Sequence, residues 1–382
     1  MTKIPYKRKF DYLFSDNTEI VLWGAANIGR RFVDFYNKYL NIVMVCDGAQ
    51  DRVGCALGNF IICTPESILY QENRIVIVTC SFYSEIRPIL ENRGYTHGMN
   101  LFNYDDIEII IEYYQHGFLR SNRIDISLTE KCTFNCKKCN MFMPYFKEPK
   151  HQLLRNVLDD IDSYFETVDY VREMELLGGE PFLYPYLDDV IRYVGEVYRH
   201  RIKRPTIFTN GAVVPSDSLL KKMREYDIWV RLSDYRAAIS YEKKWMEVKN
   251  ALETYGIHYY APAEEQWKDF GFPENSNPEM TEGELSYHFR ACLPPFRGLY
   301  QKKVAFCHLE MSAMRAGIFP YEERDYFDLT TEDQDRKEKY LEFDRGFIDK
   351  GYLEFCKVCR GCGSSNDHYV QTAEQMPRSY RG

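Results

Sequence analysis

Three closely spaced cysteines are the residues of this chain best suited to chemistry. Cys132, Cys136 and Cys139 directly follow the strand-like run 125–129. Parallel α/β folds place their chemistry on loops at the carboxyl ends of strands. Three thiolates can hold three irons of a [4Fe–4S] cubane and leave the fourth iron open, whereas structural zinc normally takes four ligands. The spacing favours an iron–sulfur site with an open iron, and a zinc knuckle or unrelated thiols are the alternative.

Short glycine-containing or polar motifs follow the next three strand-like runs, at 173–177, 205–208 and 228–232. They are Gly178-Gly179-Glu180-Pro181, Thr209-Asn210-Gly211 and Ser233-Asp234. Glycine permits close approach to the backbone, and a carboxylate such as Glu180 can receive an ammonium group. Each motif alone is typical of a turn. Motifs at the ends of four successive strands are hard to obtain by chance.

The cysteine loop and these motifs resemble the radical S-adenosylmethionine (SAM) superfamily over residues 120–265. The resemblance implies that the three cysteines bind a [4Fe–4S] cluster whose open iron chelates SAM. Electron transfer then cleaves SAM to a 5′-deoxyadenosyl radical, which abstracts hydrogen from a substrate. The implied SAM contacts are Gly178, Gly179, Glu180, Pro181, Asn210, Ser233 and Asp234. Lys138 stands where the family usually has an aromatic residue, and its side chain cannot pack flat on adenine.

Five more cysteines lie in the last quarter of the chain: Cys292, Cys307, Cys356, Cys359 and Cys362. Four thiolates suit a complete [4Fe–4S] cluster or a zinc ion. The arrangement is similar to the SPASM and Twitch extensions of radical SAM enzymes, and the cysteine number favours the shorter Twitch type. This resemblance predicts auxiliary-cluster ligands at Cys292, Cys307, Cys356 and Cys359. Cys362 is left over, as a replacement for Cys359, a catalytic hydrogen-atom donor or an inert thiol.

Composition excludes several classes of protein. The 382 residues are 45% hydrophobic and carry a net charge of −8, with no basic stripe for nucleic acid or an anionic membrane. No signal-peptide segment and no apolar run of about 18 residues is visible. We expect a cytoplasmic protein in a reducing compartment, so its cysteines are not explained by disulfides. Those at 46, 55, 63 and 80 are interpreted as small core residues.

Strand-like runs alternate with helical patterns in two regions, which predicts an α/β fold with parallel sheets. Expected strands in the first region are 19–25, 42–46 and 75–79, with helices 28–39 and 84–93 and a helical connector at 108–120. The second region has strands 124–128, 173–177, 205–208, 228–232 and 257–261, and helices 151–166, 186–199, 216–226 and 241–254. The predicted domains are a Rossmann-like domain (1–115), a radical SAM partial (β/α)6 barrel (120–265) and a small cysteine-rich Twitch/SPASM-like extension (266–382).

The first region contains a variant of the dinucleotide-binding fingerprint. Gly24, Ala26 and Gly29 follow the first strand, and Asp47 ends the second strand, where a ribose-binding acid belongs. The start of the helix offers N–H groups to a phosphate, but the Cβ of Ala26 lies near the pyrophosphate path. The segment resembles Rossmann-like domains of sugar-nucleotide-modifying proteins. A nucleotide-binding role and a ligand-free scaffold both stay open.

These observations predict a radical SAM oxidoreductase or isomerase that oxidises, epimerises or dehydrates a carbohydrate or nucleotide-linked sugar. One alternative is a peptide or protein maturase, and another is a non-catalytic iron–sulfur electron carrier. The expected electron donor is a flavodoxin or ferredoxin-type protein, and the expected cofactors are SAM, its [4Fe–4S] cluster and a second [4Fe–4S] cluster. Candidates for substrate contact are Tyr259, Tyr260, Glu264, Glu265, Trp267 and the His308 region.

Overall fold

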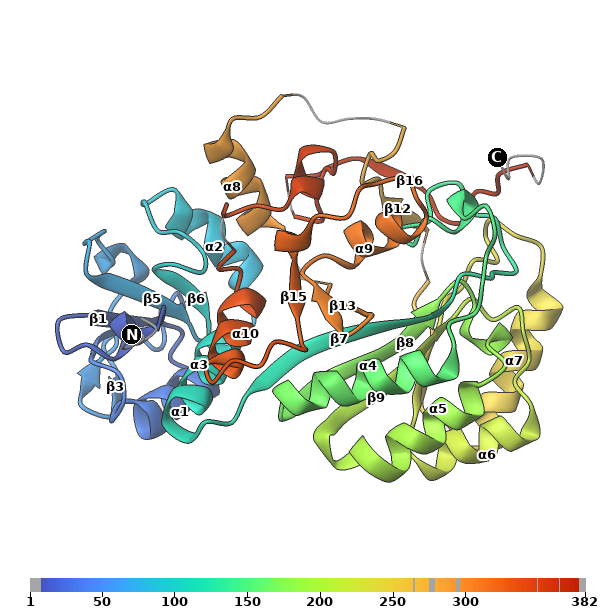
Figure 1. Cartoon of the computed structure of the whole chain (residues 1–382). Helices are drawn as coiled ribbons and strands as arrows, with labels where there is room; N and C mark the ends of the chain where they lie inside the picture. The colour runs from blue at the N-terminus through green and yellow to red at the C-terminus, as the bar shows by residue number, and fades with distance from the viewer. Residues whose placement is uncertain are drawn as a thin grey trace. The chain divides into compact units, whose positions relative to one another are not determined.

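The chain divides into two compact units, Met1–Leu119 and Arg120–Gly382, in the computed structural model (Figure 1). The structure describes residues 8–263, 265–274, 279–292, 296–348, 350–363 and 365–377. The three-domain division expected from the sequence stays a prediction. No helix in the described ranges is both long and apolar enough to cross a membrane.

A parallel four-stranded sheet forms the centre of the first unit. Its order is β2-β1-β5-β6, with bounds β1 Glu19–Trp23, β2 Ile42–Cys46, β5 Arg74–Val78 and β6 Leu101–Asn103. Every residue of β5 is buried, which explains its continuous run of β-branched residues. A small antiparallel pair, β3 Ala56–Leu57 and β4 Phe60–Ile61, forms a separate two-stranded sheet next to β2. The α/β prediction is confirmed for this unit.

The helices of the first unit differ in detail from the expected ranges. They are α1 Asn27–Arg31, α2 Tyr83–Glu91 and α3 Tyr104–His116. The expected helix 28–39 is interrupted, because α1 passes into a π-helical turn at Phe32–Tyr36. The connector helix begins at Tyr104 and ends at His116, and the φ of 66° at the following Gly117 is the left-handed conformation common after a helix.

An open eight-stranded sheet organises the second unit, in the order β11-β10-β9-β8-β7-β13-β14-β15. Its parallel strands are β7 Arg120–Thr129, β8 Tyr170–Gly178, β9 Ile202–Thr209, β10 Trp229–Leu232, β11 Tyr259–Tyr260 and β13 Gly298–Tyr300. Antiparallel strands β14 Lys303–Ala305 and β15 Tyr326–Asp328 extend one edge. Within the described ranges, no pairing joins β11 to β15, so the barrel is not closed.

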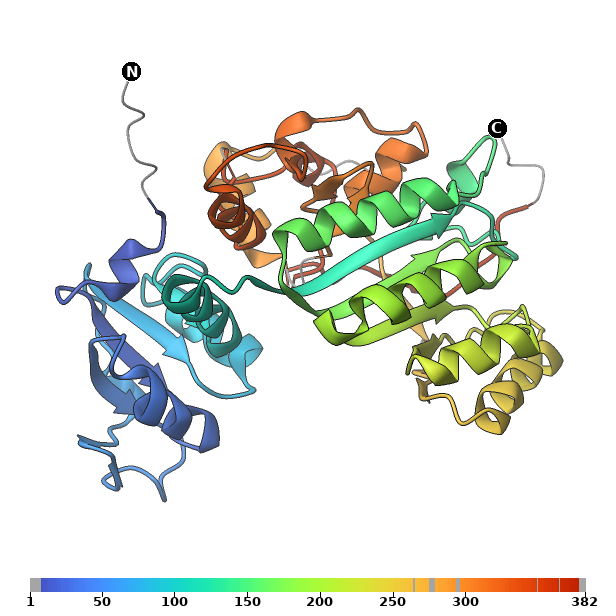
Figure 2. The same ribbon diagram turned by 60° about the horizontal axis from the view of Figure 1, so that its bottom comes forward.

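Helices between the parallel strands cover the sheet. They are α4 Leu154–Thr167, α5 Leu187–Tyr193, α6 Asp217–Glu225 and α7 Glu242–Thr254. Figures 1 and 2 show α4, α5 and α6 side by side along one face. In α4 the buried residues include Val157, Ile161, Tyr164 and Phe165, the spacing of a helix with one apolar face. Because β7, β8, β9, β10 and β11 pair in parallel, their carboxyl ends lie at one edge of the sheet.

The remaining elements of the second unit lie after β11. They are the helices α8 Glu282–Ala291, α9 His308–Arg315 and α10 Arg336–Asp344, and the antiparallel ribbon of β12 Gln266–Lys268 with β16 Tyr369–Gln371. Helix α8 begins with a capping box, in which Thr281 and Glu284 satisfy each other's backbone N–H groups. The ribbon joins segments about one hundred residues apart, so local patterns could not predict it.

Candidate active site

One cavity of about 460 Å³ lies at the carboxyl ends of the parallel strands. This volume is in the usual range for a small-molecule site. The residues predicted from the sequence that line it are Cys132, Cys136, Cys139, Gly178, Gly179, Asn210 and Ser233. The cysteine loop and the ends of β8, β9 and β10 therefore face a common space, as expected for a parallel sheet.

Of the three thiols of the cysteine loop, Cys136 is buried and Cys132 and Cys139 are partly exposed, and amide donors contact two of them. Asn210 Nδ2 lies 3.6 Å from Cys132 Sγ, and Gln375 Nε2 lies 3.3 Å from Cys136 Sγ. Burial raises the pKa of all three thiols, that of Cys136 to about 12, and Cys139 raises that value further. Iron would therefore bind by displacing protons from these thiols, and N–H donors suit the resulting thiolates.

The backbone at residues 178 and 179 passes so close to the cysteine loop that only glycine fits at both positions. A Cβ on Gly179 would stand 2.2 Å from the Lys131 carbonyl oxygen and 3.0 Å from the Cys132 Cβ. A Cβ on Gly178, whose φ is 148°, would stand 2.4 Å from the carbonyl oxygen of Thr129. Both glycines line the cavity, so their backbone is open to a ligand.

The donor set fits an iron–sulfur cluster. Soft thiolate ligands select iron–sulfur clusters, zinc and copper among biological metals. In the described residues, no three His, Cys, Asp or Glu side chains are grouped so that they could share one metal ion. A [4Fe–4S] cubane does not require its thiolates to converge on one ion, because each thiolate binds a separate iron. Cys132, Cys136 and Cys139 would hold such a cluster at the cavity wall.

Glu180 has other partners than the ammonium group predicted from the sequence. Its carboxylate is fully buried and accepts hydrogen bonds from the Thr209 hydroxyl (2.8 Å), the Asn210 N–H (2.9 Å) and the Phe182 N–H (3.1 Å). Burial nevertheless raises the pKa of Glu180 to about 7. The side chain ties the end of β8 to the end of β9, and neither it nor Pro181 lines the cavity.

Only one of the two residues of the motif after β10 lines the cavity. Ser233 lines the cavity, whereas Asp234 does not and pairs with Arg236 at 2.8 Å. The Arg236 guanidinium lies 3.9 Å from the centre of the Trp245 ring. Hydrogen bonding to Arg236 lowers the pKa of Asp234, so this carboxylate stays ionised in its pair. Asp234 therefore shapes the turn that presents Ser233.

The His308 region, expected from the sequence to contact a substrate, carries a largely buried polar group on another cavity wall, and its members Arg123 and Asp125 were not singled out from the sequence. His308 Nδ1 lies 3.0 Å from Asp125 Oδ2, and Arg123 Nε donates to Asp125 Oδ1 at 2.6 Å. Burial raises the pKa of Asp125, but the charge of Arg123 and then His308 lower it more, so the net pKa is below its usual value. An ionised Asp125 holds the proton on His308 Nδ1. Polar residues alternating within the apolar strand β7 were the available signal.

His308 is the member of this group with an unused polar atom. Its side chain is 2% exposed and lines the cavity, and its Nε2 has no hydrogen-bond partner in the described structure. A buried ring nitrogen without a partner is costly, and a bound ligand with an O–H or N–H group would satisfy it. Of the other expected substrate contacts, Trp267 lines the cavity, Tyr259, Tyr260 and Glu265 do not, and Glu264 lies outside the described residues.

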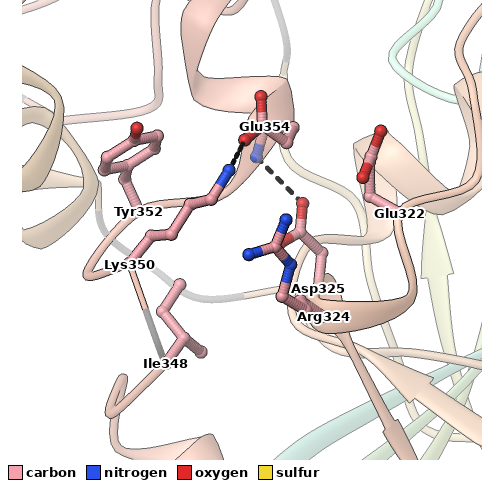
Figure 3. A pocket seen from close by; sticks show the side chains of 7 residues that line it. All are labelled: Glu322, Arg324, Asp325, Ile348, Lys350, Tyr352 and Glu354. Carbon is pink, nitrogen blue, oxygen red and sulfur yellow. Dashed lines mark hydrogen bonds and ion pairs between the residues drawn. The ribbon is translucent and has the colours of Figure 1, made fainter. Parts of the chain in front are cut away.

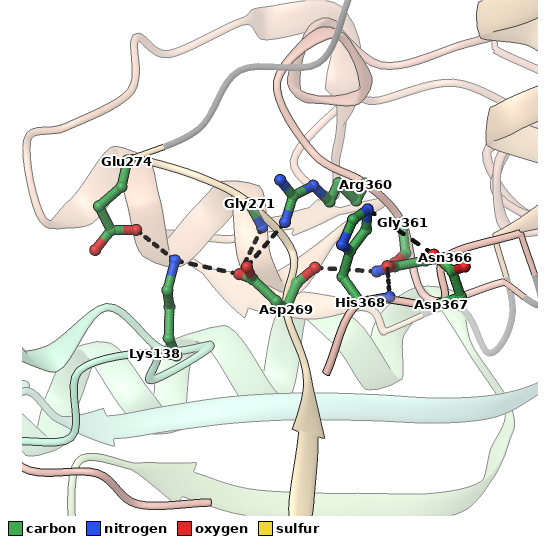
Figure 4. Close-up of polar contacts among 9 residues, drawn as sticks. All are labelled: Lys138, Asp269, Gly271, Glu274, Arg360, Gly361, Asn366, Asp367 and His368. Atoms are coloured by element: carbon green, nitrogen blue, oxygen red, sulfur yellow. Dashed lines mark hydrogen bonds and ion pairs between the residues drawn. The ribbon is translucent and has the colours of Figure 1, made fainter. Parts of the chain in front are cut away.

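Lys138 is turned toward an acidic segment. Its Nζ lies 2.8 Å from Glu274 Oε2 and 3.2 Å from Asp269 Oδ1, as Figure 4 shows. Asp269 also accepts a hydrogen bond of 2.8 Å from Arg360 Nη1. Arg360 lies next to Cys359, so a chain of ion pairs links the two cysteine-bearing segments. Lys138, at the position where the family that the sequence resembles usually has an aromatic residue, is therefore a cation with two carboxylate partners.

The five C-terminal cysteines lie together. Cys292 Sγ and Cys362 Sγ are 3.3 Å apart, and this contact lowers the pKa of Cys292 to about 7. Cys307 packs in one apolar cluster with Cys359 and in another with Cys356. None of the five lines the cavity. The four-ligand set stays a prediction, as does hydrogen donation by Cys362, which the structure pairs with Cys292 rather than placing on the cavity wall.

The glycine turn of the first unit has the tight backbone that the fingerprint predicts. Gly24 has a φ of 126°, and a Cβ there would stand 2.8 Å from the Thr79 carbonyl oxygen. A Cβ on Gly29 would stand 1.8 Å from the Gly24 carbonyl oxygen. These close approaches are between protein segments. Helix α1, which follows Ala26, is only five residues long.

Asp47 is engaged by the same turn. Its carboxylate accepts hydrogen bonds from the N–H groups of Ala25 (2.7 Å) and Ala49 (2.8 Å), and it pairs with Arg52 at 3.0 Å. Burial raises the pKa of Asp47, but these contacts lower it more, so the net pKa is below its usual value. The side chain that the sequence assigns to a ribose is used here to hold the backbone.

A second hollow in the C-terminal part is too small for an organic ligand (Figure 3). Its volume is about 10 Å³, close to the minimum for one water molecule. Asp325 accepts a hydrogen bond from the Glu354 N–H at 2.9 Å, and Lys350 pairs with the Glu354 side chain. These contacts fasten the short helix Glu354–Lys357, which contains Cys356.

Several solved structures are similar to this chain at low sequence identity. Native anSMEcpe with bound AdoMet has 9% identity, with 66% of this chain and 93% of that chain covered and a TM-score of 0.39. BtrN in complex with AdoMet and 2-DOIA has 16% identity, 67% and 96% coverage and a TM-score of 0.35. Streptococcus suis SuiB bound to precursor peptide SuiA has 13% identity, 81% and 85% coverage and a TM-score of 0.33. The match to anSMEcpe with AdoMet and Kp18Cys peptide spans only 42% of that chain.

No curated protein matches the chain. Residues 126–233 match the family model of the Radical SAM superfamily. The matched range contains the cysteine loop, the two glycines and the residues that end β9 and β10. SAM and a [4Fe–4S] cluster are the cofactors of that superfamily. Residues 126–233 are thus similar to the Radical SAM superfamily, and this region holds the cysteine-loop side of the cavity.

Proposed function

We propose that this protein is a radical SAM enzyme that works in its 460 Å³ cavity. The observation that carries the proposal is that three thiols and the ends of four parallel strands meet in one space. Cys132, Cys136 and Cys139 would hold a [4Fe–4S] cluster, and SAM would lie against the residues Gly178, Gly179, Asn210 and Ser233. When bound, the cluster and SAM supply a 5′-deoxyadenosyl radical that takes a hydrogen atom from a substrate carbon.

The residues of the chain position the reactants and exclude water. The two glycines let SAM approach the backbone, and Asn210 holds the loop through Thr133, with its Nδ2 at 3.0 Å from the Thr133 hydroxyl. Aromatic rings make up much of the remaining wall, namely Phe134, Phe208, Tyr235, Trp267, Phe270 and Phe296. Such a wall keeps water from a reactive radical. His308 Nε2 would accept a hydrogen bond from the substrate.

We propose a peptide or protein as the substrate, in preference to a sugar. The sugar expectation depended on nucleotide binding by the first unit, and Asp47 is engaged by the turn there. Near the cavity, all three residues of β12 line the wall, and within the described ranges β12 pairs with β16 alone. An extended peptide can add to such an open strand edge through backbone hydrogen bonds.

A second [4Fe–4S] cluster at the C-terminal cysteines belongs to the same proposal. The gathering of all five thiols supports it, with Cys292, Cys307, Cys356 and Cys359 as ligands and Cys362 as the alternative to one of them. Residues 266–382 would then be a Twitch/SPASM-like extension, and residues 1–115 a Rossmann-like scaffold. A flavodoxin or ferredoxin-type protein of the cytoplasm would supply electrons.

The first experiment is anaerobic reconstitution of the full chain. We expect about eight irons per chain, and 5′-deoxyadenosine with methionine after addition of dithionite and SAM. Cys132→Ala should retain about four irons and lose SAM cleavage. A reduced iron–sulfur protein that leaves SAM intact would instead be an electron carrier. Zinc in place of iron would contradict the proposal.

The substrate class has its own assay. A pool of unstructured synthetic peptides and, separately, a UDP-sugar are added to the reconstituted enzyme, and 5′-deoxyadenosine is measured against a substrate-free control. We expect the peptide pool to increase the rate of SAM cleavage. An increase with the UDP-sugar alone would restore the sugar expectation.

A further inference from the structure

A segment far along the chain lies against the cysteine loop. The Lys137 N–H donates to the Glu374 carbonyl oxygen and the Met376 N–H donates to the Asn135 carbonyl oxygen, both at 2.7 Å. These bonds make an antiparallel bridge between Cys136 and Gln375. The loop is therefore held by backbone pairing to residues about 240 positions later in the chain.

The side chain of Gln375 has a fixed orientation in this bridge. Its Oε1 accepts from the Asn135 N–H at 2.8 Å, and its Nε2 donates to the Ala373 carbonyl oxygen at 2.7 Å. A backbone N–H can only donate and a carbonyl can only accept, so the amide cannot be reversed. Nε2 also lies 3.3 Å from Cys136 Sγ. The second N–H of the amide is therefore available to the sulfur.

The segment is anchored at its other end as well. We call residues 369–376 the strap. Its first part is β16, which pairs with β12, whose residues Gln266, Trp267 and Lys268 line the cavity. Between the two anchored parts, the Thr372 N–H donates to the Glu265 carbonyl oxygen at 3.3 Å. The strap thus runs from one cavity wall to the cysteine loop, and backbone pairing on both sides fixes the position of Gln375.

We propose that the strap holds the cysteine loop, and that Gln375 is a positioning residue whose N–H bond to Cys136 Sγ stabilises the reduced form of the cluster. This inference rests on the proposed [4Fe–4S] site. Reduction adds negative charge that is shared with the cysteine sulfurs, and a hydrogen-bond donor stabilises that charge. Reduction potentials of iron–sulfur clusters depend on such hydrogen bonds and on burial, and Cys136 is 7% exposed.

The test compares three full-length variants with the wild type. Gln375→Glu keeps an acceptor for Asn135 but replaces the donor to sulfur, and Gln375→Leu removes both. Thr372→Val is the matched control, because Thr372 is a buried strap residue whose hydroxyl has no hydrogen-bond partner in the described structure. Each protein is reconstituted in a Cys356→Ala, Cys359→Ala background, so that the signal of the Cys132–Cys139 site is read alone. Iron content, the EPR spectrum of the reduced cluster and its midpoint potential are measured.

We expect both Gln375 variants to shift the one-electron reduction equilibrium toward the oxidised cluster by roughly tenfold, which is about 59 mV. Thr372→Val should match the wild type. If both Gln375 variants instead lose their iron while Thr372→Val keeps it, the strap is needed to hold the loop, which also supports the inference. An unchanged potential and EPR spectrum in iron-loaded Gln375 variants would overturn it. Absence of a [4Fe–4S] signal from the chain without any substitution would instead contradict the proposed function.

Discussion

Single side chains in the cavity have separable roles, and His308 is the one whose buried ring nitrogen has no hydrogen-bond partner in the described structure. We predict that His308→Ala lowers substrate-dependent kcat/KM by about tenfold, the value of one hydrogen bond. Substrate-independent SAM cleavage should stay near the wild-type rate, because in the described residues Asp125 and His308 make no hydrogen bond to a cysteine of the loop, and Asp125 instead binds His308 and Arg123. The measurement is 5′-deoxyadenosine formation with and without peptide, at equal iron content. An equal loss in both assays would mean that His308 acts on the cluster site.

Glu180 predicts a pH dependence of stability. Burial raises its pKa from 4.5 to about 7, so the folded state favours the protonated form. Its contribution to the free energy of unfolding is fully present below pH 4.5 and is lost as the pH rises through 7, by about 3 kcal/mol. Glu180→Gln should lack this loss. Denaturation of both proteins at pH 5 and pH 8 checks it, and parallel pH profiles would show that the carboxylate is not the cause.

At the scale of elements, the loop after β8 depends on the glycine at position 179. Gly179→Ala should displace the cysteine loop, because the new Cβ would overlap the Lys131 carbonyl oxygen. We expect most of the iron to be lost and the free energy of unfolding to fall by about 1–3 kcal/mol. Gly283→Ala is the matched control, since a Cβ there meets nothing within 4 Å. Iron analysis and chemical denaturation measure both effects, and normal iron content in Gly179→Ala would refute the steric argument.

Elements with strong local patterns were predictable from the sequence. The expected strands 124–128, 173–177 and 205–208 correspond to β7, β8 and β9, because apolar residues that alternate with polar ones, or form short runs, mark strands. The contacts made by Gln375 and His308 were not predictable in the same way. Their partners Asn135 and Asp125 lie about 240 and 183 residues away, and no local pattern records such pairs.

For the whole molecule, the division into two units gives a direct prediction. Every residue that lines the cavity lies in Arg120–Gly382. A protein consisting of residues 120–382 should therefore bind iron and cleave SAM without substrate at a rate within about twofold of the full chain. Reconstitution and 5′-deoxyadenosine analysis of the shortened protein test this. Failure to cleave SAM despite a folded, iron-loaded state would show that the first unit contributes to the chemistry.

The strap also has a consequence in time. Gln375 is made about 240 residues after Asn135, an interval of roughly 12–48 s at ordinary rates of translation. During that interval the nascent cysteine loop has none of its strap contacts. Delivery of iron and sulfide to a completed loop would then follow synthesis of the strap. Ribosome-bound chains that stop short of it would carry three thiols in a loop that is not yet held.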